Sequence, residues 1–497
     1  MPVNPGATLT DVHRRHLLRR AGFGPSPKEM QALSKAETRG EAADDLLDFP
    51  AKPFKPGGKD FFRMHNKWFK FMLKTRYPLQ SKLVLFWHDH FATGFSKVFD
   101  TQLMGDQIRL LHGNAKGNFR TFLKEMNRNA AMMEWLDTVR NSKFVPNENY
   151  AREVQELFTL GVNDLNGEPN YTQADIVQIA RAFSGWRFDS DNNQPFFRED
   201  RHDFMAAFPS RGPKVLYGST GGFAGAQSFA NPEGETEIDQ VTDIIFQHRD
   251  SDGQNTVARR TTKRLLEYFC HGGWATIDAS KKTTIDQLIA TSNFDVDFNV
   301  QTLLRAIFTH DAFYATAAEA PFAASLPRSV KWPVDFVVST LRMTGVKGKG
   351  RDLVIEGGSF SSLDSHLESM GQILLDPPSV FGWDWEQAWV SSATLLARYN
   401  FARDIIMARE GGGRFRPEKL VPLSIDNQPP TAEDLVNAVI VALGLEGELT
   451  DAERDILLDY LGGPGTQLDV LNDLELRERK LGGLFALVMQ SPVYQTH

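Results

Sequence analysis

The sequence predicts a mainly α-helical protein, folded as a single large multi-helix domain with a long irregular insert and few short strands. Along most of its 497 residues, apolar side chains recur at the three- and four-residue spacing of amphipathic helices. Residues that cap helices, and glycines that end them, stand at the boundaries of these segments. The longest break in the periodicity runs from Gly185 to Gly234.

In the N-terminal half, the apolar spacing predicts a run of successive helices. Ser26, Pro27 and Glu29 illustrate the boundary signals: Ser26 suits an N-cap, Pro27 the first helical position, and Glu29 completes a capping box. Gly161 suits the position just beyond a helix end. The expected helices cover residues 10–21, 27–34, 40–47, 60–75, 78–92, 100–111, 118–127, 130–135, 148–160 and 173–183.

The stretch 185–234 is rich in Asp, Asn, Gly, Pro and Phe and lacks helical periodicity. It predicts a long, partly ordered loop that contains one short hairpin. Loops of this length within a domain are usually functional or mobile. We therefore expect this insert to cover a substrate.

Helical periodicity returns after the insert, and two Gly- and Pro-containing segments, 345–358 and 411–430, resemble linkers. We expect a helical core domain over residues 1–345, with the insert at about 185–234, and a helical C-terminal subdomain over residues 346–497 packed on the core. The expected helices cover residues 238–247, 256–271, 284–291, 300–309, 333–343, 363–372, 391–410, 431–443, 451–461 and 471–490.

Composition excludes several classes of protein. The net charge of −8 argues against a nucleic-acid partner, which would need a basic surface. The single cysteine, Cys270, lies in an apolar helical segment, which predicts a buried thiol and allows neither an internal disulfide nor a thiolate zinc cluster. The basic cluster of Arg259, Arg260, Lys263 and Arg264 is typical of a solvated helix face.

We expect no membrane span, because no apolar run approaches the ~20 residues that one requires. The N-terminus has arginines but no hydrophobic stretch after them, so we expect no secretory signal in this chain. A cytoplasmic location, or a periplasmic one after processing, is compatible with this pattern.

The most informative segment is the expected helix 148–160. At 3.6 residues per turn, Tyr150, Ala151, Val154, Leu157 and Phe158 share the face that a helix would bury. The opposite face carries three carboxylates, amides and a guanidinium. Its polar residues are Glu148, Asn149, Arg152, Glu153, Gln155, Glu156 and Thr159.

This polar face admits two interpretations. An exposed helix would pair Glu148 with Arg152 four residues later. Alternatively, Arg152 would keep one carboxylate ionised while a buried neighbour has a raised pKa, the division that a general acid and a general base require. Asp137 ends the preceding helix about ten residues before Glu148. A helical hairpin would therefore place the two carboxylates side by side at the same opening of a site. A cap or turn is the other interpretation of Asp137.

His88 and His90 suggest a metal site at first sight. On the helix expected there, residues two apart point about 200° apart, so the two imidazoles would not chelate one ion. A buried histidine in such an apolar setting usually satisfies a backbone carbonyl. Trp186, Trp383, Trp385 and Trp389 fall in or beside expected loops, where an indole suits sugar stacking if exposed and core packing if not.

Several motifs occur in order along nearly the whole chain. They are LLRRAGFG at 17–24, FWHDHF at 86–91, NENYARE at 147–153, YTQAD at 171–175, ARAFSGW at 180–186, HD at 202–203, PPSVFGW at 377–383 and SP at 491–492. Together they resemble the bacterial family DUF1800, a domain of unknown function. The resemblance implies no particular activity.

The main functional prediction is a hydrolase, a glycoside hydrolase that acts on a polysaccharide or oligosaccharide. We expect Glu148 or Glu153 to act as general acid, and Asp137 or the other glutamate as base or nucleophile, with His88 tuning their ionisation. No cofactor and no metal are expected in this mechanism. The expected substrate-binding residues are Arg152, Glu156, Asn149, His90, Trp186 and Trp383.

Two alternatives stay open at this point. One is a metal-dependent enzyme that uses His88 or His90 with Glu153 and Glu156, joined by the pair His202 and Asp203. The other is a non-catalytic binding or assembly protein, in which the polar face of helix 148–160 forms an interface.

Overall fold

The computed structural model describes residues 2–50, 55–56, 60–204, 209–229, 234–315, 328–348, 353–355, 362–408 and 414–497. Within these residues the chain forms helices α1 to α24, several one-turn 3₁₀ helices and two small two-stranded sheets. The mainly α-helical fold is confirmed. One continuous hydrophobic core runs from Leu9 to Tyr494 and includes segments on both sides of residue 345. The division into a core domain and a C-terminal subdomain stays a prediction.

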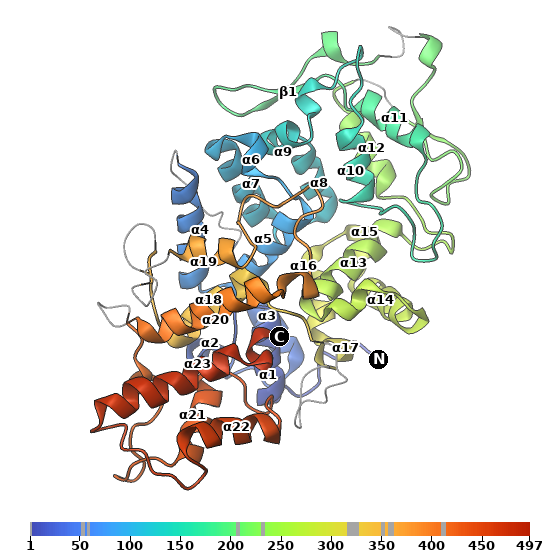
Figure 1. Cartoon of the computed structure of the whole chain (residues 1–497). Helices are drawn as coiled ribbons and strands as arrows, with labels where there is room; N and C mark the ends of the chain where they lie inside the picture. The colour runs from blue at the N-terminus through green and yellow to red at the C-terminus, as the bar shows by residue number, and fades with distance from the viewer. Residues whose placement is uncertain are drawn as a thin grey trace.

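The N-terminal helices pack around a central one, α5 (Pro78–His90), in which every residue is buried. Pro78 stands at its first turn, as the sequence predicts, and the sequence FWHDH ends it. Helix α7 packs on it, and rings of α4 and α8 contact its Trp87 and His88 (Figure 1). The bounds are α1 (Asp11–Arg20), α2 (Pro27–Ala32), α3 (Arg39–Leu47), α4 (Phe61–Lys74), α6 (Phe95–Val98), α7 (Thr101–Asn114), α8 (Phe119–Asn127) and α9 (Ala130–Trp135).

The next elements lie at one end of the molecule, at the top of Figure 1. Helices α10 (Asn149–Glu156) and α11 (Gln173–Ala182) pack against each other, and α12 (Glu237–Ile245) follows the insert. The described parts of the insert hold the hairpin β1 (Trp186–Phe188) and β2 (Pro195–Phe197), and the pair β3 (Val215–Leu216) and β4 (Gln227–Ser228). Both pairs are antiparallel, so the insert contains one more strand pair than expected. Residues 205–208 and 230–233 of the insert lie outside the described residues.

Helix α13 (Thr256–Phe269) is long and packs on α14 (Ala279–Ser292) and α16 (Val300–Thr309). Cys270 is its C-cap and is buried, as predicted. Two four-residue helices, α15 (Phe294–Asp297) and α17 (Asp311–Tyr314), were not predicted, because a single turn is too short to show a helical period.

The C-terminal helices include a π-helical segment, Leu476–Leu481, where the sequence predicts one continuous α-helix over residues 471–490. None of the described helices is long and apolar enough to cross a membrane. Parts of the expected linkers 345–358 and 411–430 lie outside the described residues. The bounds are α18 (Pro333–Thr344), α19 (Leu363–Ser369), α20 (Ser392–Met407), α21 (Ala432–Ala442), α22 (Asp451–Leu461), α23 (Gly482–Gln490) and α24 (Pro492–Gln495).

Candidate functional site

Helix α10 buries one face and leaves its glutamates at the edge of solvent. Tyr150, Ala151 and Val154 are buried, as the helical period predicts. Gln155, expected on the polar face, is buried as well, and its Oε1 accepts a 3.0 Å hydrogen bond from the Tyr217 hydroxyl. The insert therefore covers part of the face that the sequence assigns to solvent.

Helix α10 ends earlier than expected, at Glu156 rather than at residue 160. The amides of Phe158 and Leu160 bond to carbonyls five residues back, those of Glu153 and Gln155, so the last turn widens and the α-helical pattern stops. Gly161 follows with φ +82°, the left-handed conformation that glycine adopts without strain. This wide turn ends α10 directly after Glu156.

Glu153 is the most perturbed carboxyl of the predicted set. Its side chain is half-buried, and its buried Oε2 atom has no hydrogen-bond partner among the described residues. Burial, and then the neighbouring charge of Glu156, raise the pKa of Glu153 to about 7, against the opposing effect of Arg152. A carboxyl with this pKa exists in both protonation states near neutral pH, which suits a general acid or base.

Glu156 lies one turn after Glu153 and is held in a defined position. The Tyr171 hydroxyl donates a hydrogen bond of 2.8 Å to its Oε2 atom. Burial, and then the hydrogen bond to Glu156, raise the pKa of Tyr171 well above its ordinary value, so the hydroxyl stays a donor. The two glutamates thus differ in environment: Glu156 accepts a hydrogen bond, and the buried oxygen of Glu153 does not.

Helix α13 supplies a cationic side to this site. Arg260 donates a 2.8 Å hydrogen bond to the backbone carbonyl of Glu156, at the C-terminal end of α10. Gly161 makes room for it, because a Cβ at that position would lie 2.5 Å from Nη1 of Arg260. Burial, and then the nearby charge of Arg264, lower the pKa of Arg260 to about 10.

Arg264, one turn further along α13, links this cluster to the end of α5. Its Nη2 atom lies 3.3 Å from Oδ2 of Asp89, and its guanidinium stacks 4.2 Å from the ring centre of Trp385. Asp89 also accepts hydrogen bonds from the Trp383 amide at 2.8 Å and the Trp385 indole at 3.0 Å. Burial raises the pKa of Asp89 to about 6, although these partners oppose the shift.

The structure thus brings together helices α5, α10 and α13 and the loop 382–385. We call this set the polar cluster. Its members are Asp89, Glu153, Glu156, Tyr171, Arg260, Arg264 and Trp385.

The other polar residues of the α10 motif lie at the opposite end of the helix. Gln173 donates a 2.7 Å hydrogen bond to Glu148 and accepts one of 3.1 Å from Arg152. Glu148 and Arg152 lie 4.0 Å apart and are both exposed, which is the surface pairing that the sequence also allows. Asn149 donates to Asp137 at 3.4 Å. The helical hairpin therefore brings Asp137 to the start of α10.

Asp137 is held there by cations rather than by another carboxyl. Lys97 donates to its Oδ2 atom at 2.8 Å, and Arg140 lies 3.6 Å from Oδ1. Its backbone has φ +58°, a left-handed turn that aspartate tolerates. Asp137 thus has the turn role that the sequence offers as its alternative.

His88 is completely buried between Trp68 and Trp383, with ring centres 5.5 and 5.3 Å away. Its Nε2 atom accepts a 3.0 Å hydrogen bond from the Leu375 amide, so the ring is neutral and protonated on Nδ1. Burial lowers the pKa of His88 to about 3. In this position His88 holds a loop rather than facing the glutamates.

His90 satisfies a backbone carbonyl, as expected of a buried histidine. Its Nε2 atom lies 3.1 Å from the carbonyl oxygen of Phe158. Burial, and then the charges of Arg264 and Arg260, lower the pKa of His90 well below its ordinary value. His90 therefore borders the polar cluster as a neutral group.

The two tryptophans predicted to bind substrate are buried. Trp186 lies in β1 with the Arg128 guanidinium 4.6 Å from its ring centre, and Trp383 packs against His88 and Trp332. Neither indole presents a free face for a sugar. Trp385 is half-buried and is the tryptophan that reaches the polar cluster.

The residues of the metal hypothesis do not converge. His202 is buried in the insert, with its Nε2 atom 3.0 Å from Lys214, and Asp203 pairs with Arg181 at 3.2 Å and with Arg211 at 2.6 Å. His88 and His90 have the backbone partners described above. Across the described ranges, no group of three or more His, Cys, Asp or Glu side chains is arranged to hold a metal ion.

Four members of the polar cluster, Asp89, Tyr171, Arg260 and Arg264, were not predicted as site residues, whereas Trp385 was named among the loop tryptophans that could stack on a sugar. Asp89 stands inside the motif FWHDHF, between the two histidines that were considered as metal ligands. The predicted solvated face of α13 is wrong for Arg259, which is buried among Asp250, Asp252 and Asp286. The spacing of Arg260, Arg264 and Glu267, which places them on one helix face, is the signal that was available.

Comparison with known families extends these observations to the whole chain. The profile of the family described as "Protein of unknown function (DUF1800)" matches residues 16–496. Comparisons with curated proteins and with solved structures give no match. The match covers every motif that contributes to the polar cluster, and the chain therefore belongs to the DUF1800 family.

Proposed function

We propose that this protein is a hydrolase that cleaves glycosidic bonds at the polar cluster, with Glu153 as its general acid. The observation that supports the proposal is the burial and the raised pKa of the Glu153 carboxyl. This carboxyl is half-buried, has a pKa of about 7, and has a buried oxygen without a hydrogen-bond partner among the described residues. Such a group can deliver a proton at neutral pH, whereas an ordinary glutamate is ionised there.

Glu156 supplies the second carboxyl that glycoside hydrolysis requires. In the proposed reaction, protonated Glu153 donates its proton to the glycosidic oxygen as the bond to the anomeric carbon breaks. The Glu156 carboxylate, positioned by Tyr171, then serves as base toward water or as nucleophile. The proposal replaces Asp137 and Glu148, which lie at the other end of α10, with Glu156 in this second role.

The surroundings of the glutamates support a carbohydrate ligand. Arg260, Lys263 and Arg264 place three cations along one side of α13, and the Arg264 guanidinium lies over the half-buried Trp385 indole. Guanidinium groups bind carboxylates and sulfates through paired hydrogen bonds. These features favour polysaccharides with anionic sugar units.

The test is hydrolysis of a panel of neutral and anionic polysaccharides, measured as release of reducing ends. We expect Glu153→Gln to lower kcat by about 10²–10⁴-fold, the range for loss of a general acid. Glu168→Gln, which changes an exposed glutamate in the loop between α10 and α11, is the matched control and keeps the wild-type rate. Absence of cleavage by the wild type across the panel, or full activity in Glu153→Gln, would overturn the proposal.

A further inference from the structure

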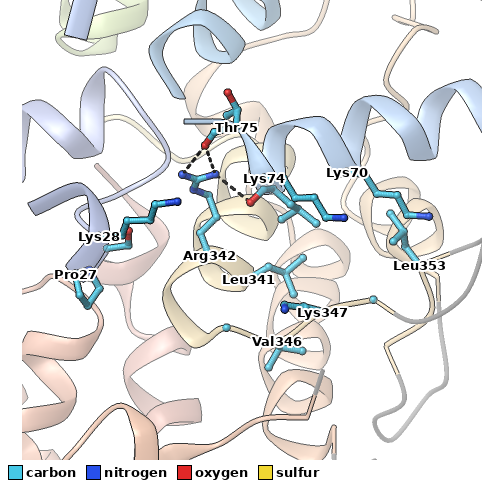
Figure 2. A pocket seen from close by; sticks show the side chains of 14 residues that line it. Pro27, Lys28, Lys70, Lys74, Thr75, Leu341, Arg342, Val346, Lys347 and Leu353 are labelled. Atoms are coloured by element: carbon cyan, nitrogen blue, oxygen red, sulfur yellow. Dashed lines mark hydrogen bonds between the residues drawn. The ribbon is translucent and has the colours of Figure 1, made fainter. Parts of the chain in front are cut away.

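A concave site that contains none of the α10 glutamates lies among α2, α4 and α18. Its cavity volume is about 600 Å³, within the range of sites for small organic ligands. Figure 2 shows the side chains from these three helices, and from the segment after α18, that surround it. We call it the lysine pocket, lined by Ser26, Pro27, Lys28, Lys70, Leu73, Lys74, Thr75, Leu341, Arg342, Gly345, Val346, Lys347, Gly348 and Leu353.

The charges of the lysine pocket have one sign. Lys28, Lys70, Lys74 and Lys347 line it, and its described lining contains no carboxylate. Lys70 and Lys74 stand one turn apart on the last turns of α4, so they share a face. Among the described residues no carboxylate lies within ion-pair distance of Lys28, Lys74 or Lys347. Four lysines around one cavity are notable in a chain of net charge −8.

Arg342 is part of the wall of the pocket, because its guanidinium bonds to neighbouring backbone and carboxylate groups. Its Nη1 atom donates to the carbonyls of Met72 and Leu73 at 2.9 and 3.1 Å, and its Nη2 atom pairs with Glu29 at 2.5 Å. These contacts fasten α18 to the C-terminal end of α4, where the backbone carbonyls have no helical partners. These contacts hold the end of α4, which carries Lys70 and Lys74, in place against α18.

The rest of the lining is aliphatic. Leu73, Leu341, Val346 and Leu353 contribute branched side chains, and Figure 2 shows Leu341 and Val346 on the side opposite α4. The described lining contains no aromatic side chain on which a sugar or a nucleobase would stack. The site thus combines a cationic rim with an aliphatic wall.

We propose that the lysine pocket binds an anionic amphiphile, a molecule with a carboxylate or phosphate head and an acyl or alkyl chain. The lysine ammonium groups would bind the head, and contact of the chain with the half-buried Leu73 and with the methylene groups of the lysines would add the hydrophobic contribution. This proposal does not depend on hydrolysis at the polar cluster, because the two sites share no residue.

The test is calorimetric titration of the full chain with dodecyl phosphate and with laurate, each below its micelle concentration. We expect one molecule of either ligand to bind per chain. Dodecyltrimethylammonium, which has the same chain and the opposite charge, should not bind. Inorganic phosphate should bind at least about tenfold more weakly than dodecyl phosphate, because it lacks the buried chain.

Substitutions distinguish binding at the lysine pocket from nonspecific binding of the detergent to the protein surface. The double variant Lys70→Gln and Lys74→Gln should weaken dodecyl phosphate binding by at least about tenfold. Lys67→Gln, on an exposed position of the same helix outside the lining, is the matched control and should bind like wild type. Leu73→Gln, at a half-buried wall position, should weaken dodecyl phosphate but leave inorganic phosphate unchanged.

Four outcomes would overturn the proposal. They are equal affinity of the double variant and wild type, equal affinity for the cationic and anionic detergents, equal affinity for phosphate with and without a chain, and binding seen only with vesicles of anionic phospholipid. The last outcome would indicate a membrane surface instead of a single molecule. Circular dichroism of each variant confirms that it is folded before its affinity is interpreted.

Discussion

The hydroxyl of Tyr171 donates a 2.8 Å hydrogen bond to Oε2 of Glu156 and so joins the segment before α11 to the last turn of α10. The bond fixes one of two glutamates that stand a single helical turn apart. The other, Glu153, keeps a buried oxygen without a partner among the described residues. This difference in environment underlies the acid and base roles proposed for the pair.

Removing that hydroxyl should cost stability. Tyr171→Phe keeps the ring and deletes the donor to a carboxylate, so we expect the free energy of unfolding to fall by about 1–3 kcal/mol. Urea unfolding at pH 7 measures the change, and Tyr77→Phe, at an exposed tyrosine, controls for loss of a hydroxyl alone. Equal stability of the two variants would show that the Tyr171 bond contributes nothing.

Because Gly161 lies against Arg260, we expect alanine at position 161 to destabilise the protein by a steric clash as well as by backbone strain. Gly161 and Gly167 both have positive φ, +82° and +94°, so alanine should cost about 1–2 kcal/mol at either position. A new Cβ would meet Arg260 only at Gly161, whereas no atom lies within 4 Å at Gly167. Gly161→Ala should therefore lose a further ~1–3 kcal/mol in urea unfolding. Equal losses would mean that Arg260 moves aside freely.

The hydrogen bonds of Asp89 attach the loop 382–385 to the end of α5, so we expect their loss to lower the stability of the protein. Asp89→Asn keeps the size of the side chain but places an amide donor among the donors of Trp383, Trp385 and Arg264. We expect the free energy of unfolding to fall by roughly 2–4 kcal/mol at neutral pH. Asp384→Asn, at an exposed aspartate in the same loop, should be neutral. A neutral Asp89→Asn would contradict the role assigned to this carboxylate.

The buried histidines predict loss of stability in acid. Where burial lowers a histidine pKa, the folded state binds a proton less readily than the unfolded chain, so stability is present above about 6.5 and falls as the pH drops toward the folded pKa. Each such group adds up to about 1.4 kcal/mol per pH unit to the slope. The pKa is lowered at His16, His88, His90, His112, His248, His271, His366 and His497.

Urea unfolding between pH 8 and pH 5 tests this expectation. Among the described residues, five carboxyls have raised pKa values that oppose the trend, which is fewer than the eight histidines. They are Asp45, Asp89, Glu153, Asp250 and Glu446. His88→Gln should reduce the slope, because it removes a group whose pKa lies near 3. Stability that stays constant from pH 8 to pH 5 would contradict the burial of these rings as neutral groups.

Helical periodicity and caps predict most of the fold, since each long helix buries an apolar stripe that the sequence displays. Helices α9, α16 and α22 occupy the residues expected of them. The end of α10 could not be predicted, because it depends on a wide turn that Arg260 of α13 and the fold around Gly161 select. One-turn helices and the π-helical segment carry no periodic signal at all.

The candidate site was predicted in part. Glu153 and Glu156 were chosen from their place on one helical face, and they lie in the polar cluster. Asp89 and its contact with Trp385 were not predicted, because α5 and the loop 382–385 meet through contacts between residues almost 300 positions apart. The histidines of the motif FWHDHF suggest a metal or catalytic site by their chemistry, but in the structure both bond to backbone groups.

The protonation of Glu153 also affects folding. Its pKa of about 7 exceeds the ordinary value near 4.5, so the folded state holds the proton more tightly and stability falls as the pH rises from about 4.5 to 7. Glu153→Gln should remove this loss and become the more stable protein at pH 8, by roughly 1–3 kcal/mol after allowance for partial exposure. Glu168→Gln should show no such gain.

The most direct measurement is the titration of Glu153 itself, followed by NMR in protein labelled with ¹³C at the glutamate carboxyl carbon. The signal is assigned by its absence from Glu153→Gln. An apparent pKa near 7 is the result that a general acid requires and that burial beside Glu156 predicts. A value at or below 5 would contradict the assignment of Glu153 as the general acid of this DUF1800 protein.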